Sequence, residues 1–238
     1  MIKVKSLTKK FGNFIAVDNI SFEIPGNQVV GFLGPNGAGK STTMRMLTGY
    51  FPPTTGDITV GGIDVVQDPL KVKSITGYLP ENSPVYKDMT VIEFIKFVAS
   101  IRGVESHKLE AALDRVITLC SLQGVLHQPI DTLSKGYLQR VCFAQAVVHD
   151  PQYLILDEPT DGLDPNQKYE IRNLIREMGQ NKTILISTHI LEEVDACCSR
   201  VIIISQGKIK ADDKPDNLRK RYGKEDLSAI FRELTKVG

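Results

Sequence analysis

The chain contains no tryptophan, no excess of one charge and no long apolar run. Its 29 lysines and arginines and its 28 aspartates and glutamates leave a formal charge of +1. The chain therefore has no large net positive charge to attract nucleic acid. No apolar stretch approaches the ~20 residues of a membrane-spanning helix, and residues 201–204 suffice only for a strand. The N-terminus lacks the apolar segment of a signal peptide. We therefore expect a cytoplasmic protein that does not bind nucleic acid and that reaches membranes only through a partner.

Cysteine is scarce as well. The four cysteines are Cys120, Cys142, Cys197 and Cys198, and their spacing is not that of a metal site. The last two are adjacent, which disfavours a simple disulfide framework. We expect buried thiols in a reducing compartment.

Short apolar runs alternate with helical patterns along the chain, which favours an α/β protein whose mostly parallel sheet is covered on both faces. The 238 residues suit one large domain or one domain with an inserted subdomain. The expected strands are 20–24, 29–33, 57–60, 75–79, 153–157, 183–187 and 201–205, and the expected helices between them are 42–48, 165–178 and 190–198.

Residues 85–150 interrupt this alternation and read as a block of three helices. The first should start at a capping box formed by Thr90 and Glu93. We expect Ser106 to cap the second helix. The third should run from about Lys135 to His149.

A phosphate-binding loop is the most specific feature of the sequence. Residues 34–41 match the pattern G-x-x-x-x-G-K-[ST] without a mismatch, between an expected strand and an expected helix. Such a loop wraps backbone N–H groups around nucleotide phosphates. Lys40 should reach the β- and γ-phosphates, and the Ser41 hydroxyl should ligate Mg²⁺. The expected ATP-binding residues are Gly34, Pro35, Asn36, Gly37, Ala38, Gly39, Lys40, Ser41 and Thr42.

Two expected strands end in groups that suit hydrolysis. Residues 153–157 run into Asp157 and Glu158. We expect Asp157 to hold Mg²⁺ through water and Glu158 to polarise the attacking water. His189 follows the expected strand at 183–187, in the run Ser187-Thr188-His189, beside the same edge. A lone histidine at a strand end is more often structural, but here it should contact the γ-phosphate or the attacking water.

The segment Leu133 to Arg140 reads Leu-Ser-Lys-Gly-Tyr-Leu-Gln-Arg and is similar to the signature Leu-Ser-Gly-Gly-Gln-x-Gln-Arg. With residues 157–160, Asp-Glu-Pro-Thr, it resembles the nucleotide-binding subunit of an ATP-binding-cassette (ABC) transporter over about residues 1–215. The resemblance implies a P-loop NTPase fold of the ABC type. That fold has a mostly parallel sheet, an antiparallel β subdomain and an inserted helical subdomain.

The resemblance also implies roles for single residues. Asp164 would belong to the D-loop, and it is also a good helix cap. His189 would be the switch histidine. Phe11 would stack on adenine, or it would simply be a core residue near the N-terminal strand.

In this family, one subunit's signature segment closes over the ATP of the other in a head-to-tail dimer. Ser134, Lys135 and Gly136 would act in this way on the partner's ATP, in a homodimer or a heterodimer. Ser134 is also a helix cap, and both roles are compatible.

Besides Tyr137, which replaces the signature glutamine, two departures from the family pattern introduce a charged residue. Glu81 stands in place of the Q-loop glutamine, where it still offers an oxygen to Mg²⁺, and Lys135 replaces a signature glycine. Both departures resemble an export branch that includes antibiotic-resistance, sodium-efflux and gliding-motility ATPases. We hypothesise that the two charges compensate each other across the dimer.

The sequence therefore predicts a Mg²⁺-dependent ATPase that powers an exporter through integral membrane subunits. The alternative is a soluble ABC ATPase acting in translation or DNA maintenance, and the signature segment disfavours a P-loop kinase. Residues 216–238 lie beyond the expected ATPase domain as an amphipathic helical extension, with Leu227, Ile230, Phe231 and Leu234 on one face. This extension would pack on its own domain or contact another subunit.

Overall fold

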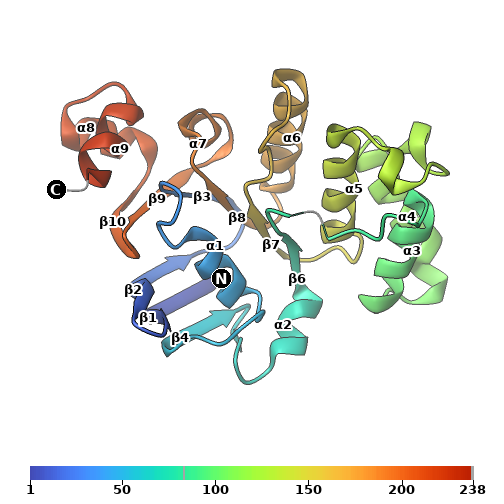
Figure 1. Ribbon diagram of the computed structural model, residues 1–238, viewed down its shortest axis with the longest axis horizontal. Helices are drawn as coiled ribbons and strands as arrows, with labels where there is room; N and C mark the ends of the chain where they lie inside the picture. Colours follow the sequence, from blue (N-terminus) through green and yellow to red (C-terminus); the bar gives the residue numbers. More distant parts are fainter. Residues whose placement is uncertain (83, 237–238) are drawn as a thin grey trace.

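The computed structural model describes residues 1–82 and 84–236, which form two β-sheets surrounded by helices (Figure 1). The larger sheet has the order β10-β9-β3-β8-β7-β6, and every neighbouring pair in it is parallel except β10 and β9. Its strands are β3 (Gln28–Leu33), β6 (Thr76–Leu79), β7 (Tyr153–Asp157), β8 (Thr183–Thr188), β9 (Arg200–Ser205) and β10 (Lys208–Asp213). The predicted mostly parallel sheet is thus confirmed.

The smaller sheet is antiparallel and has the order β2-β1-β4-β5. Its strands are β1 (Ile2–Phe11), β2 (Phe14–Ile24), β4 (Thr55–Val60) and β5 (Ile63–Asp64). The predicted strand at 20–24 is the second half of β2, which has 11 residues. The antiparallel β subdomain that the resemblance implied is therefore present.

The helices after α2 lie in three groups (Figure 1). At one end, α3, α4 and α5 gather beside β6, and at the opposite end α8 and α9 lie beyond β9 and β10. Helices α6 and α7 lie between these two ends. The bounds are α1 (Lys40–Leu47), α2 (Pro69–Ile75), α3 (Val91–Ile101), α4 (Leu109–Leu119), α5 (Lys135–Val147), α6 (Pro165–Met178), α7 (Leu191–Cys197), α8 (Pro215–Tyr222) and α9 (Leu227–Thr235). Three short 3₁₀ turns, η1 (Ser106–Lys108), η2 (Gln123–Val125) and η3 (Ile130–Thr132), lie between α3 and α5.

Most helix starts agree with the sequence, and one does not. The capping box of α3 is present: the Glu93 carboxylate accepts from the Thr90 N–H at 2.9 Å, and the Thr90 hydroxyl accepts from the Glu93 N–H at 3.4 Å. The predicted cap at Ser106 is wrong. Ser106 opens the 3₁₀ turn η1, and α4 begins after Lys108 without a side-chain cap.

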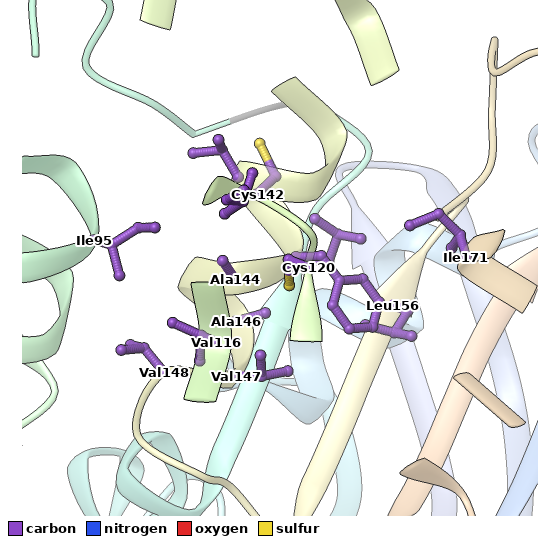
Figure 2. Close-up of a cluster of buried hydrophobic side chains, with 14 of the residues drawn as sticks. Ile95, Val116, Cys120, Cys142, Ala144, Ala146, Val147, Val148, Leu156 and Ile171 are labelled. Carbon is purple, nitrogen blue, oxygen red and sulfur yellow. The ribbon is translucent and has the colours of Figure 1, made fainter. Parts of the chain in front are cut away.

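Helix α5 is the centre of the largest apolar core (Figure 2). Its residues from Val141 to Val147 are all buried, because the sheet covers one side of the helix and α3 and α4 cover the other. Figure 2 shows Ile95 of α3, Val116 of α4, Leu156 of β7 and Ile171 of α6 around it. The helical block therefore shares one packed core with the sheet.

The four cysteines form no disulfide. Cys120, Cys142 and Cys197 are buried as predicted, whereas Cys198 is only partly buried. No helix in the described ranges is long and apolar enough to cross a membrane.

The C-terminal helix α9 packs on its own chain. Leu227 and Ile230 are buried against Val201 and Ile203 of β9. Of the two predicted roles for the tail, packing on its own domain is the one observed. The last two residues of the expected extension, 237 and 238, lie outside the described residues, and the domain limit near residue 215 stays a prediction.

Candidate active site

The phosphate loop connects β3 to the N-terminus of α1. Gly37 and Gly39 have φ angles of 77° and 103°, in the region that disfavours side chains. A Cβ on Gly34 would collide with the Ile204 carbonyl oxygen, so glycine is required there as well. No side chain caps the first N–H groups of α1. This arrangement is typical of an anion site.

A cavity of about 360 Å³ lies beside the loop. It brings together most of the predicted site residues from distant parts of the sequence. The lining residues are Phe14, Ala16, Asn36, Gly37, Ala38, Gly39, Lys40, Ser41, Thr42, Glu81, Glu158, Asp161 and His189. The volume and the polar lining suit a nucleotide's phosphate chain.

The side chain of Lys40 is almost fully buried, and its ammonium is held by three oxygens. It donates to the carbonyls of Gly34 at 2.8 Å and Pro35 at 3.3 Å, and it lies 3.3 Å from Glu158 Oε1. A buried charge needs such partners, because an unpaired one is costly to remove from water. All three partners are oxygens, which a phosphate group also offers.

Asp157 has the surroundings expected of a metal-holding carboxylate. Its Oδ1 accepts from the Ser41 hydroxyl at 3.1 Å and from the Ser187 hydroxyl. Its Oδ2 is buried and has no hydrogen-bond partner among the described residues. Burial raises the pKa of Asp157 above its ordinary range, although the hydroxyls of Ser187 and Ser41 lower it. A serine hydroxyl beside an unpartnered carboxylate oxygen fits a Mg²⁺ ion, which prefers oxygen ligands.

Glu158 and His189 meet across the ends of β7 and β8. The Glu158 Oε2 atom lies 3.0 Å from His189 Nδ1. The Glu158 N–H donates to the hydroxyl and the carbonyl of Ser187, at 3.0 and 3.2 Å. Glu158 has a φ of 50°, which is strained for a residue with a side chain. These bonds hold the turn that directs its carboxylate into the cavity.

Ser187 was missed by the sequence analysis. It is fully buried, and it holds both Asp157 and Glu158. The available signal was a hydroxyl residue in β8, a strand that also contains Thr183 and Thr188 beside its three apolar residues. That signal did not say which residues it would contact.

The aromatic residue that lines the cavity is Phe14, not Phe11. Phe11 packs edge to face on Phe51, with ring centroids 5.8 Å apart, and the Lys9 ammonium lies 5.2 Å from the Phe11 centroid. Phe11 remains half exposed, so its stacking on adenine stays a prediction. Phe14 was not considered for this site.

The signature residues lie outside this cavity. Ser134 caps α5, where its hydroxyl accepts from the Tyr137 N–H at 3.4 Å. A Cβ on Gly136 would collide with the Gln167 side chain, and one on Gly162 would collide with the Lys135 ammonium. The signature segment is thus packed against residues 161–167 of its own chain.

Asp164 caps α6, as one of its two predicted roles requires. Its carboxylate accepts from the N–H groups of Asn166 at 2.9 Å and Gln167 at 3.0 Å. The acidic residue of this loop that lines the cavity is Asp161, which the sequence analysis did not single out. The D-loop role of Asp164 stays a prediction.

The sequence profile of the ABC transporter family matches residues 17–161. The chain belongs to the ABC transporter family. As a member, it is an ATP-binding protein with a P-loop NTPase fold of the ABC type, and it hydrolyses ATP.

Two relatives and one solved structure place the chain within the family. It is 34% identical over 92% of its length to a probable multidrug ABC transporter ATP-binding protein, YbhF of Escherichia coli, and spans 38% of that protein. It is 35% identical over 99% of its length to the Nod factor export ATP-binding protein I of Sinorhizobium fredii, and spans 70% of that protein. The structure of an ATP-binding subunit of an ABC transporter matches with a TM-score of 0.90 and 28% identity, over 99% of this chain and 100% of the other.

Proposed function

We propose that the chain binds ATP in the cavity beside the phosphate loop and hydrolyses it with Glu158 as the general base. The convergence of three side chains carries this proposal: the Glu158 carboxylate lies 3.3 Å from the Lys40 ammonium and 3.0 Å from His189. A carboxylate placed there can take a proton from water that attacks the γ-phosphate. The Lys40 ammonium can bind the β- and γ-phosphates.

Ser41 and Asp157 would hold Mg²⁺, and Glu81 lines the same cavity with a further oxygen. When bound, the ion supplies positive charge against the β- and γ-phosphate oxygens. As phosphate oxygens enter, they would compete with Glu158 for Lys40. The Glu158 carboxylate would then keep its contact with His189 and would be available to accept a proton from the attacking water.

The signature segment would act on the ATP of a second ATPase subunit. Ser134 and Gly136 begin α5, yet neither lines the cavity of their own chain. The N–H groups at the start of α5 suit an anion brought by another molecule. We infer a head-to-tail dimer, a homodimer or a heterodimer, in which each signature segment closes over the partner's ATP.

A second cavity, of about 480 Å³, supports docking to a membrane subunit. Large apolar side chains exposed to solvent line it, and Lys73 and Arg102 lie among them. The exposed apolar residues are Tyr50, Leu70, Tyr86, Phe97 and Ile101. Exposed apolar patches of this kind mark protein contacts. We name these residues the apolar groove.

We propose that the membrane subunits of an exporter occupy the apolar groove and hold the protein at the cytoplasmic face. The two relatives named above, a probable multidrug protein and a Nod factor export protein, support an export role. The alternative, an ABC ATPase acting in translation or DNA maintenance, would leave the apolar groove without a membrane partner.

Leu70→Asp tests this docking. Leu70 is 79% exposed, so the change should leave the fold and the basal ATPase rate unaltered. Burying a carboxylate among the apolar side chains of this contact is costly, so docking should weaken. We expect co-purification with the membrane protein encoded beside the chain's gene, and stimulation of ATP turnover by it, to be lost. Val66→Asp, at an exposed residue outside the groove, is the matched control. Unaltered co-purification of Leu70→Asp would contradict the docking proposal.

The charges of Glu81 and Lys135 should be coupled in the dimer. Glu81 lines the cavity, and the Lys135 ammonium lies over Gly162 in the loop after Glu158, on the surface that would face the partner. Two unit charges ~6 Å apart interact by about 3 kcal/mol at an effective dielectric of 20. Glu81→Gln removes a negative charge and Lys135→Gly removes a positive one. The two changes should therefore shift ATP-driven dimerisation in opposite directions.

The double variant should restore much of the balance, with a non-zero coupling energy from dimerisation measured in all four proteins. Additivity within ~0.5 kcal/mol would show that the two charges act independently.

A further inference from the structure

Behind the active site lies a buried carboxylate that the mechanism above does not use. Glu193 of α7 is only 2% exposed, and it does not line the ATP cavity. Burial raises the pKa of Glu193, and a hydrogen bond from the Thr188 hydroxyl lowers it. A polar group in such a place is costly unless its hydrogen bonds are made. Its partners therefore indicate what it does.

Those partners are the two turns that carry Glu158 and His189. The Thr160 hydroxyl donates to Glu193 Oε1, and Thr160 is itself buried, two residues after Glu158. Thr188 is also buried and directly precedes His189. One carboxylate thus contacts both turns from behind. The Arg172 guanidinium lies 4.0 Å from the same Oε1 atom and balances its charge.

The turn after Glu158 is fixed at its start, in its middle and at its end; in the middle, the Gln139 amide donates to the Pro159 carbonyl at 2.7 Å. At its start, the Glu158 N–H bonds to Ser187. At its end, Thr160 is held by Glu193, and its carbonyl accepts from the Leu163 N–H at 3.3 Å. Without the bond to Glu193, the turn loses its link to α7 and keeps the bonds from Ser187 and Gln139, so Glu158 is held less firmly relative to β8. A strained residue such as Glu158 keeps its conformation only where its surroundings hold it.

We propose that Glu193 is a positioning residue for ATP hydrolysis, which acts through Thr160 and Thr188 to hold Glu158 and His189 at their working separation. This inference rests on the proposed catalytic role of Glu158. Because Glu193 does not line the cavity, its loss changes the rate of hydrolysis and not the affinity for ATP.

The first test is a matched pair at Thr160. Thr160→Val removes the hydroxyl with little change in volume, and Thr160→Ser keeps it. We expect Thr160→Val to lower kcat about ten- to hundredfold, as small misplacements of catalytic groups do, with the Kd for ATP unchanged. Thr160→Ser should recover most of the turnover. Glu193→Leu, which removes both carboxylate oxygens at similar volume, should resemble Thr160→Val.

Thr183→Val is the control for the loss of a buried hydroxyl. Thr183 lies at the opposite end of β8, where its hydroxyl accepts from the Asn27 N–H at 3.2 Å. The Tm of the Thr183→Val protein should fall about as much as that of Thr160→Val. The kcat of the Thr183→Val protein should equal that of the wild type. Equal kcat for Thr160→Val and wild type would overturn the proposal, as would a kcat loss in Thr183→Val as large as that in Thr160→Val.

A second test separates this proposal from the catalytic role of Glu158. In a Glu158→Gln background, Thr160→Val should cause little further loss in single-turnover rate, because the group it positions is already gone. An equal fold-loss in both backgrounds would mean a general structural role and would overturn the proposal. If Glu158→Gln alone turned over like the wild type, the proposed general base would be wrong, whatever Thr160 does.

Discussion

Replacing Lys40 with alanine should abolish tight ATP binding or hydrolysis. The change removes the buried ammonium that lies among the Gly34 and Pro35 carbonyls and Glu158. The loop would then keep its backbone N–H groups but lose its side-chain cation against the phosphates. We expect turnover to fall ~10²-fold or more, which is typical when one electrostatic contact to the reacting group is lost.

ATP affinity by calorimetry and phosphate release by a coupled assay measure this effect. Lys40→Met keeps most of the aliphatic volume and should show the same loss, which separates the charge from the packing. Lys108→Ala is the matched control, because Lys108 is an exposed lysine paired with Glu105 far from the loop. Turnover like the wild type in Lys40→Ala would refute the assignment of the phosphate loop.

The parts of the site that lie in short stretches of sequence were the parts that could be predicted. Residues 34–41 form their loop because their glycines allow φ angles that other residues avoid, and this is a local property. Likewise, β7 and β8 were found as apolar runs, and Asp157 and His189 follow from where those runs end. The capping box at Asp164 is equally local, and α6 starts as expected.

The contacts between strands could not be predicted in the same way. Ser187 lies opposite Asp157 only because β7 and β8 are parallel neighbours in this register. A register is set by the whole sheet and not by either strand alone. For the same reason, the contact from Glu193 to Thr160 joins residues that no local pattern connects.

Weak patterns explain the elements that were missed. Helix α2 has 7 residues, and only Val72 among them is buried, so it presents no apolar stripe. Half of the residues of helix α8 are charged, and Pro215 and Leu218 are its buried residues. Tertiary contacts stabilise both helices. Helices this short rarely show an apolar periodicity in the sequence.

The second large effect is expected from Glu158→Gln. Glutamine keeps the size of Glu158 and can still bond to His189, which lies 3.0 Å from the carboxylate. It cannot take a proton from water, and general-base assistance is worth ~10²–10⁴-fold in rate. The Ser41 and Asp157 contacts remain, and Lys40 loses a competing carboxylate at 3.3 Å. ATP binding should therefore be kept or strengthened while hydrolysis nearly stops.

With hydrolysis blocked, the closed dimer should accumulate. On a sizing column with ATP and Mg²⁺, Glu158→Gln should elute as a dimer, whereas the wild type should return to a monomer as ATP is consumed. Glu105→Gln, at the exposed partner of Lys108, is the matched control and should behave like the wild type. A Glu158→Gln protein that stays monomeric and active would contradict both the catalytic role and the ATP sandwich. A monomer that binds ATP but does not hydrolyse it would contradict the sandwich alone, because the base and the dimer interface are tested by separate measurements.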